Sequence, residues 1–160
     1  MKKTLLLALV VILTAATGAF AAKGGGFAIG AEVSSTNFNS WGGMVTLHIS
    51  DVPLYFALGG YANSSDFGID LKGDYWLVHG EVVRGLDWFL GLGGYLSIQV
   101  QPNSTYAFGA RLPIGVQIWP LGQLLEVFFE IAPAWIPFTG GGVDLSNFAL
   151  QPALGFRIWL

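Results

Sequence analysis

The 160-residue sequence contains no cysteine and little charge of either sign. Without cysteine, the chain cannot form a disulfide framework, a thiolate metal site, a cysteine nucleophile or a lipoprotein acylation site. Charged residues make up 11% of the chain, about half the share of an ordinary soluble domain, and the net charge is −3. The absence of a basic cluster excludes a nucleic-acid-binding surface. The apolar share of 53% excludes a disordered chain.

Long hydrophobic runs are also scarce, although the mean hydropathy is +0.60. The one long run, Leu5–Leu13, follows two lysines and precedes small residues at Ala19 and Ala21. This order is typical of a secretory signal peptide, and the run is shorter than the roughly 20 residues that a transmembrane helix needs. We therefore predict a signal peptide over residues 1–21, cleaved after Ala21, and a single domain over residues 22–160.

The rest of the chain alternates with a period of two, which places successive side chains on opposite faces of a β-strand. In the last segment Leu154, Phe156 and Ile158 share one face, whereas Gly155 and Arg157 share the other. Eight such segments are present, and each is long enough for a tilted strand to cross a bilayer. They cover 27–33, 41–50, 54–61, 67–77, 86–99, 108–119, 125–135 and 147–160.

Two features interrupt this pattern. Val78–Gly85 is predicted to be a link between the fourth and fifth strands, with His79 in contact with solvent. Pro113, Pro133 and Pro152 fall inside predicted strands, where each removes a hydrogen bond from the ladder. The last two are predicted to mark strand ends or bulges.

The distribution of charge between the two strand faces predicts the fold class. Charged residues share a face with glycine, alanine and serine, and the other face is continuously apolar. Such an apolar surface is too large to leave in water, whereas lipid contact accommodates it, and barrel closure pairs every backbone group as lipid requires. The prediction is an all-β fold: an eight-stranded antiparallel up-and-down transmembrane β-barrel with an apolar exterior and a polar interior filled by side chains.

Charges in a narrow lumen need partners. A turn at Leu121-Gly122 would place Gln117 opposite Glu126 and Arg111 diagonal to Glu130, and Arg157 would meet Glu126. We interpret the charges as a salt-bridge plug, because an eight-stranded lumen is just wide enough to be filled by side chains; an ion path is the alternative. The predicted interior network comprises Glu32 (expected at the level of Arg111 and Glu130), the ladder Asp70, Lys72 and Asp74 with Asp87 nearby, and Arg111, Glu126, Glu130 and Arg157.

Aromatic residues near strand ends predict the interfacial belt of a membrane barrel. The predicted girdle comprises Trp41, Tyr106 and Trp135 at the outer rim and Tyr75 and Trp88 at the inner rim. The connections predicted to be exposed outside the cell are Ser34–Ser40, Asn63–Asp66, Gln101–Thr105 and Phe138–Leu145.

Four segments carry a resemblance to a known family: Val52–Gly60, Trp88–Tyr95, Arg111–Val116 and Leu125–Pro133. With them the chain resembles the small eight-stranded OmpA/OmpX-like outer-membrane barrels, and more narrowly the uncharacterised barrel families of spirochaetes. One of those families includes a complement factor H-binding surface protein.

The resemblance implies location in the bacterial outer membrane after export across the inner membrane. It implies an inward network of arginine and glutamate and a C-terminal strand read by the barrel-assembly machinery. That strand is carried here by Gly155, Ile158 and Leu160, although Leu160 stands where the family usually has an aromatic residue. The implied partners are outer-membrane lipid, the assembly machinery, periplasmic chaperones and a host surface or serum protein.

These observations favour a non-enzymatic structural or surface-interaction protein without cofactor, metal or nucleic-acid partner. A narrow channel or carrier for small molecules is one alternative. A lipid-modifying enzyme is the other, because His48-Ile49-Ser50 matches the His-x-Ser of outer-membrane lipid A deacylases, in which a histidine activates a serine. Asp51 replaces the asparagine that usually follows.

Overall fold

The computed structural model describes residues 26–49, 53–62, 67–100 and 105–160. The predicted signal peptide therefore lies outside the described residues, as do the connection 63–66 and most of the connection 101–105. In the described part of the chain, no helix has the length and apolar character needed to cross a membrane.

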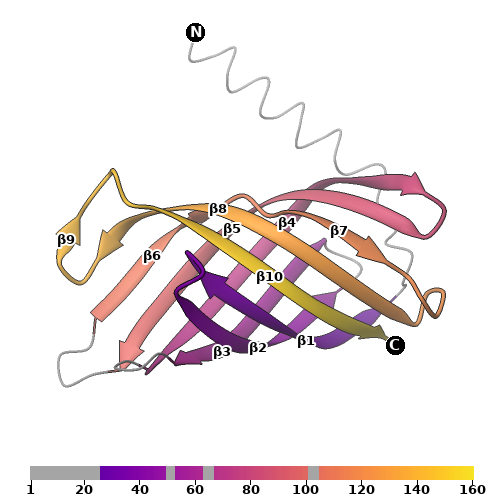
Figure 1. Ribbon diagram of the computed structural model, residues 1–160, viewed down its shortest axis with the longest axis horizontal. Coiled ribbons are helices and arrows are strands. Elements are labelled where there is room, and N and C mark those ends of the chain that lie inside the picture. Colours follow the sequence, from indigo (N-terminus) through magenta and orange to yellow (C-terminus); the bar gives the residue numbers. More distant parts are fainter. Residues whose placement is uncertain (1–25, 50–52, 63–66, 101–104) are drawn as a thin grey trace, which may run out of the picture.

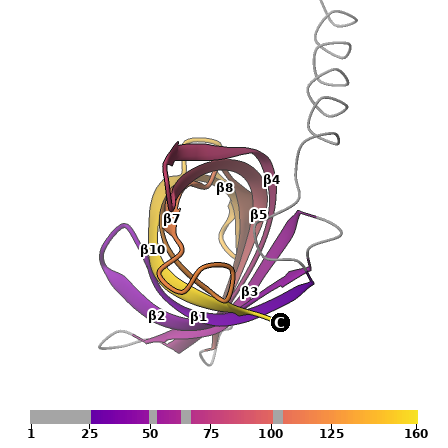
Figure 2. The same ribbon diagram turned by 90° about the vertical axis from the view of Figure 1, so that its right-hand side faces the viewer.

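The described residues form one antiparallel sheet that closes on itself (Figures 1 and 2). Most strands pair with their neighbours in the chain, and the last strand, Phe148–Trp159, pairs with the first, Phe27–Thr36, as well as with Leu125–Thr139, which closes the ring. The strands are β1 (Phe27–Thr36), β2 (Ser40–Ile49), β3 (Leu54–Ala62), β4 (Phe67–Val83), β5 (Leu86–Val100), β6 (Thr105–Arg111), β7 (Ile114–Ile118), β8 (Leu125–Thr139), β9 (Gly142–Val143) and β10 (Phe148–Trp159).

The ten strands occupy eight strand positions around the barrel, each of which is called a stave here. β6 and β7 are two parts of one stave, because both pair with β5 on one side and β8 on the other, and β9 is a two-residue extension paired with β8. Pro113 separates the two parts, since it has no N–H to donate. Its buried ring lies beside Gly91 and Trp76, and the Gly91 N–H donates to the Pro113 carbonyl at 2.8 Å. The predicted number of eight strands is therefore confirmed.

The prediction that Pro133 and Pro152 end strands or form bulges is wrong. Both lie inside the continuous ladder between β8 and β10. Pro152 is tolerated because the β1–β10 ladder ends at Ser34, so its missing N–H removes no bond to β1. Beyond that point, the Asn37 N–H donates to the Leu150 carbonyl at 2.8 Å, and the Leu150 N–H donates to Asn37 Oδ1 at 2.7 Å.

The predicted link Val78–Gly85 is also wrong. β4 continues to Val83, and the connection to β5 is a turn at Arg84 and Gly85, whose φ of +84° suits glycine. Two register shifts in β4 disturb its alternation, which explains why the sequence pattern did not reveal the strand. His79 is half-buried within β4, with its ring 6.3 Å from that of Trp76, rather than free in solvent.

Two predicted exposed connections are smaller than expected. Ser34–Ser40 is mostly strand, because β1 runs to Thr36 and β2 begins at Ser40, and both Ser34 and Ser35 are buried. The turn between them places Asn37 and Phe38 at φ values of 52° and 60°. Part of Phe138–Leu145 belongs to β8 and β9. Both segments have the composition of a turn. In the first, however, the Ser34 and Ser35 side chains are buried in the barrel interior.

The orientation of the side chains is as predicted. Leu154, Phe156 and Ile158 are 58%, 44% and 41% exposed, whereas Arg157 between them is 3% exposed. The same alternation runs along β2, where valine and leucine face outward and Thr46 is buried. The protein therefore has an apolar outer surface and an interior filled by charged, polar and aromatic side chains.

Candidate functional site

The interior side chains form three layers that succeed one another along β4. The strand runs from the end of the barrel that carries β9, here the β9 rim, towards the end that carries Phe27 and Trp159, here the terminal rim (Figure 1). Asp70 marks a hydroxyl layer, Lys72 and Asp74 an ion-pair layer, and Trp76 an aromatic layer. The layers differ in chemistry, so each is described separately.

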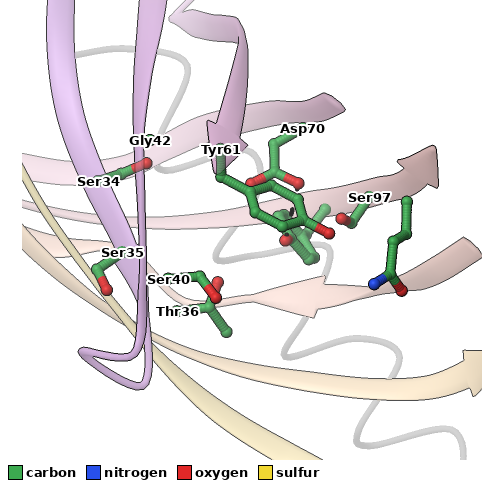
Figure 3. A pocket seen from close by; sticks show the side chains of 10 residues that line it. Ser34, Ser35, Thr36, Ser40, Gly42, Tyr61, Asp70 and Ser97 are labelled. Carbon is green, nitrogen blue, oxygen red and sulfur yellow. Dashed lines mark hydrogen bonds between the residues drawn. The ribbon is translucent and has the colours of Figure 1, made fainter. Parts of the chain in front are cut away.

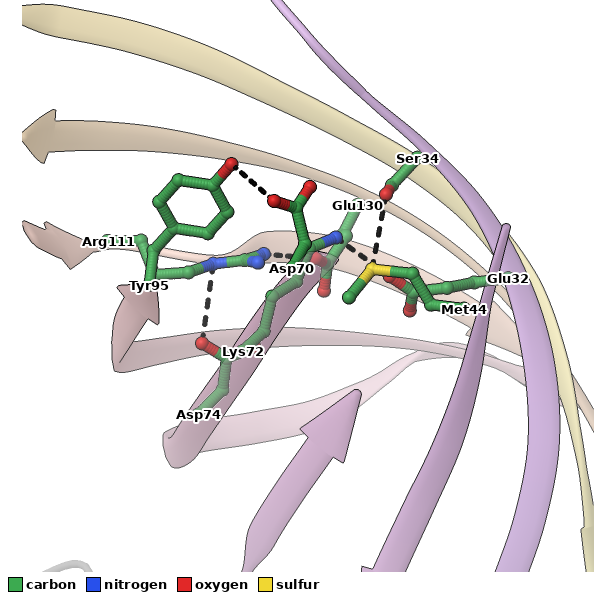
Figure 4. Close-up of polar contacts among 9 residues, drawn as sticks. All are labelled: Glu32, Ser34, Met44, Asp70, Lys72, Asp74, Tyr95, Arg111 and Glu130. Carbon is green, nitrogen blue, oxygen red and sulfur yellow. Dashed lines mark hydrogen bonds and ion pairs between the residues drawn. The ribbon is translucent and has the colours of Figure 1, made fainter. Parts of the chain in front are cut away.

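The ion-pair layer holds two cations and three carboxylates (Figure 4). The Lys72 Nζ atom lies 2.7 Å from Glu32 Oε1. The Arg111 guanidinium pairs with Glu130 through Nη2 and with Asp74 through Nε, at 3.3 Å from Oδ1. Arg111 is fully buried and the other four are nearly so. Opposite charges at this depth compensate each other, and the layer fills the middle of the lumen.

The strand register and the width of the barrel together determine which of these residues meet. Arg111 lies opposite Ala134 in the ladder, and Gly115 rather than Arg111 is opposite Glu130. The arginine therefore reaches along the strand to Glu130. Glu32 was expected near Arg111 and Glu130; it lies in the same layer but pairs with Lys72, which reaches across the lumen from β4 to β1.

A second ion pair lies nearer the terminal rim. Arg157 and Glu126 are direct cross-strand partners, and Arg157 Nη1 donates to Glu126 Oε1 at 2.5 Å. The indole Nε1 of Trp159 donates to the other carboxylate oxygen at 2.9 Å. The guanidinium carbon lies 3.8 Å from the centre of the Phe128 ring and 4.7 Å from that of Tyr55. Two aromatic rings therefore pack close to the cation.

The aromatic layer consists of His48, Tyr55, Trp76, Phe89 and Phe128. Four of its rings form a continuous stack, with centroid distances of 4.0 Å from His48 to Tyr55, 3.8 Å from Tyr55 to Trp76, and 4.0 Å from Trp76 to Phe89. The stack runs across β2, β3, β4 and β5. It closes the lumen beside the second ion pair.

Sequence reasoning did not identify the aromatic layer as a plug. The feature that could have indicated this layer is a glycine opposite each of two inward-facing rings. Gly115 pairs with Phe89, and Gly155 pairs with Phe128. A Cβ at either glycine would collide with the ring it faces. Glycine at these positions makes room for large rings inside a narrow barrel.

His48 is packed into the aromatic layer. Its Nδ1 atom lies 3.1 Å from the Leu54 carbonyl oxygen, and its ring is also 4.8 Å from that of Trp159. The side chain is buried and faces the lumen, away from lipid. Ser50 and Asp51, the other members of the enzyme-like motif, lie outside the described residues. The geometry of His48 is that of a packed core residue.

One predicted pairing and one predicted position are corrected. Gln117 lies opposite Phe128 and not Glu126, because the connection from β7 to β8 spans Trp119–Leu124 and shifts the register by two residues. Asp87 was predicted to lie near the ladder of charges on β4. It lies instead towards the terminal rim, opposite Glu81, where its Oδ2 accepts a hydrogen bond from Trp119 Nε1 at 2.9 Å.

The exterior holds the predicted girdle residues. Trp41, Trp88, Tyr106 and Trp135 are exposed on the outer surface, whereas Tyr75 is half-buried. Tyr75 is not at the rim of its own strand, because β4 continues for eight residues beyond it. The placement of the other four suits contact with a bilayer interface.

The C-terminal residues close the barrel seam. Gly155 faces the interior against Phe128, whereas Ile158 and Leu160 are exposed outside. The Leu160 N–H donates to the Phe27 carbonyl at 2.8 Å, so pairing extends to the last residue. The final strand therefore has an apolar outer face, and its hydrogen-bond ladder with β1 is complete at this end.

The connection between β9 and β10 is held by local hydrogen bonds. Trp135 Nε1 donates to the Leu145 carbonyl at 3.0 Å. The backbone N–H and the hydroxyl of Ser146 donate to Asp144 Oδ1 at 2.9 Å and 2.6 Å, and these bonds lower the pKa of Asp144. The connection therefore has a defined turn at the β9 rim.

Comparison with known proteins shows where this architecture recurs. No family model matches the chain, and no curated protein matches it either. Solved structures do match. The N-terminal β-barrel domain of Pseudomonas aeruginosa OprF is 14% identical with a TM-score of 0.54, covering 84% of this chain and 98% of that one. The fold is that of a small transmembrane β-barrel.

Two further structures agree with this assignment. Neisserial surface protein A is 14% identical with a TM-score of 0.54, covering 84% of this chain and 97% of its own. A structure from the de novo design of transmembrane β-barrels is 14% identical with a TM-score of 0.53, covering 88% of this chain and all of that one. At this identity the likeness concerns the fold, so function is argued from the interior and the rims.

Proposed function

We propose that the protein is a non-enzymatic barrel of the bacterial outer membrane with a structural and surface-interaction role. The filled lumen is the observation that carries this proposal: the ion-pair layer and the aromatic layer follow each other along the barrel. Side chains occupy the centre, so the barrel has the character of a rigid scaffold.

The proposal places the β9 rim outside the cell. Apolar side chains are exposed there at Phe38, Val143, Leu145 and Phe148. Exposed apolar groups on ordered turns are suited to binding another protein, and a host surface or serum protein is the partner we propose. The turns are short, so the contact would be small.

Export and assembly complete the proposal. Residues 1–21 direct export across the inner membrane, with periplasmic chaperones carrying the chain onward. The barrel-assembly machinery then reads the last strand through Gly155, Ile158 and Leu160. The outward position of Ile158 and Leu160 supports this role, because the machinery must reach them before the seam closes.

Conductance in planar bilayers distinguishes the scaffold from a channel. We expect the reconstituted protein to be silent, since two successive layers of buried side chains block the lumen. Folded protein is verified beforehand by its faster gel migration before boiling. Reproducible current steps in the wild type that change in size or ion selectivity in Arg111→Ala would instead establish a channel.

A further inference from the structure

The hydroxyl layer contains a cavity that the scaffold role does not use (Figure 3). Its volume is about 230 Å³, and its walls come from β1, β2, β3, β4 and β5 near the β9 rim. Thr36, Ser40, Tyr61 and Gln99 are partly exposed, whereas Asp70, on the side towards the ion-pair layer, is buried. The cavity therefore extends from a solvent-accessible mouth to a buried floor.

The lining has an unusual composition for a cavity of this size. Four serines, one threonine and two tyrosines contribute hydroxyl groups, and Gln99 adds an amide. Among the described residues that line it, Asp70 is the sole charged side chain. Hydroxyl groups both donate and accept hydrogen bonds, so this lining matches a ligand rich in hydroxyls. A single carboxylate adds a preference for one positive charge.

Asp70 is held in place for such a role. The Tyr95 hydroxyl donates to its Oδ1 atom at 3.1 Å, and the Ser97 side chain also hydrogen-bonds to it. Lys72, two residues further along β4, is paired with Glu32 at 2.7 Å (Figure 4). The cation two residues along the strand is therefore engaged with Glu32, and the two hydroxyl groups hold the Asp70 carboxyl group at the cavity floor.

A second observation points to a ligand. The Ser35 hydroxyl is buried, with the residue 4% exposed, and it has no hydrogen-bond partner among the described residues. Ser35 lines the same cavity. Buried hydroxyls are normally satisfied, so this one is available to a molecule inside the cavity.

Tyr61 supplies an aromatic wall. Gly68 on β4 has no side chain, and the Tyr61 ring lies directly over it. One face of the ring therefore packs on the backbone, which fixes the ring at the side of the cavity (Figure 3). An immobilised aromatic ring is suited to packing against the C–H face of a cyclic ligand.

We propose that this cavity binds a single sugar ring that carries a protonated amine. The ammonium group pairs with Asp70, the ring hydroxyls bond to Ser35 and the neighbouring serines, and one sugar face lies on Tyr61. The volume of about 230 Å³ is below the roughly 300–1,000 Å³ of sites for drug-sized molecules, so it holds one ring rather than an oligosaccharide.

The test is a titration of the folded full-length barrel in detergent with D-glucosamine, followed by NMR chemical shifts. Glucose and N-acetylglucosamine serve as neutral comparisons. We expect glucosamine to bind about tenfold more tightly than either, because only its ammonium group can form a charge-assisted hydrogen bond with Asp70. Asp70→Asn should remove that advantage. Asp144→Asn, an exposed carboxylate near the same rim, is the matched control and should leave binding unchanged.

Tyr61→Ala is a second variant at a partly exposed position, and it should weaken glucosamine binding about fivefold. Gel mobility before boiling verifies that each variant is folded. Equal affinity for the three sugars, binding that survives both Asp70→Asn and Tyr61→Ala, or no saturable binding up to about 50 mM would overturn the assignment. The bilayer recording is independent of these outcomes, so failure of the sugar site leaves the scaffold proposal standing.

Discussion

Replacing Arg111 with methionine is expected to lower the free energy of unfolding by about 3–5 kcal/mol. Arg111 is the fully buried cation that faces both Glu130 and Asp74. Methionine conserves much of the volume but leaves two carboxylates buried without a counter-charge. Lys72 compensates them only in part, because it is paired with Glu32 at 2.7 Å. Urea unfolding of the barrel in vesicles, followed by tryptophan fluorescence, measures the change.

Two further variants separate charge from packing. Arg84→Met removes an exposed arginine at the β4–β5 turn and should change stability by less than about 0.5 kcal/mol. Combining Arg111→Met with Asp74→Asn and Glu130→Gln should recover more than half of the loss, because the stranded charges are then gone. If the triple variant is no more stable than Arg111→Met alone, uncompensated charge is not the cause.

Removing the central ring of the aromatic layer should have an effect of similar size. Trp76→Ala is expected to lower the free energy of unfolding by about 3–5 kcal/mol, the range for a buried aromatic replaced by alanine. Trp76 touches Tyr55 on one face and Phe89 on the other, at 3.8 Å and 4.0 Å between centroids. The same urea titration, followed by far-ultraviolet circular dichroism, measures the loss.

Trp41→Ala is the control for this effect. Trp41 lies on the outer surface and is 52% exposed, so its replacement leaves no interior cavity. We expect it to cost less than half as much as Trp76→Ala. Equal losses for the two variants would show that the interior stack is no more important for stability than contact with lipid.

The sequence determines the side-chain orientation and the main charge pairs because both follow from alternation. Period two assigns each residue to a face, and the position of one turn then brings complementary charges into register. Arg157 and Glu126 are cross-strand neighbours, and Arg111 pairs with Glu130, as the charge pattern indicates.

Contacts that cross the lumen follow from the closed barrel and not from local pattern. Lys72 and Glu32 lie on β4 and β1, and their meeting depends on the width and tilt of the whole barrel. The aromatic stack draws one ring from each of four strands, so no single segment reveals it. Gln117 illustrates the sensitivity to turns: a connection longer than expected moved its partner from Glu126 to Phe128.

Local disturbances of the strand period account for the other differences. The bulges in β4 interrupt its period-two alternation, so the sequence pattern did not predict that the strand continues to Val83. Serines at 34 and 35 have the composition of a turn, yet they line a polar cavity. Pro152 looks like a strand breaker, but it lies where the ladder to β1 has already ended.

The orientation of the two strand faces is tested most directly by spin labels in lipid vesicles. The chain has no cysteine, so single labels can be placed at Leu154→Cys, Phe156→Cys and Ile98→Cys outside and at Ser97→Cys inside, beside the cavity. The measured quantity is the collision rate of each label with oxygen, which dissolves in lipid, and with a water-soluble nickel chelate. The outer three should collide often with oxygen and rarely with nickel, whereas the label at 97 should show low oxygen collision. A nickel-accessible label at 154 and 156, together with an oxygen-accessible label at 97, would contradict the account.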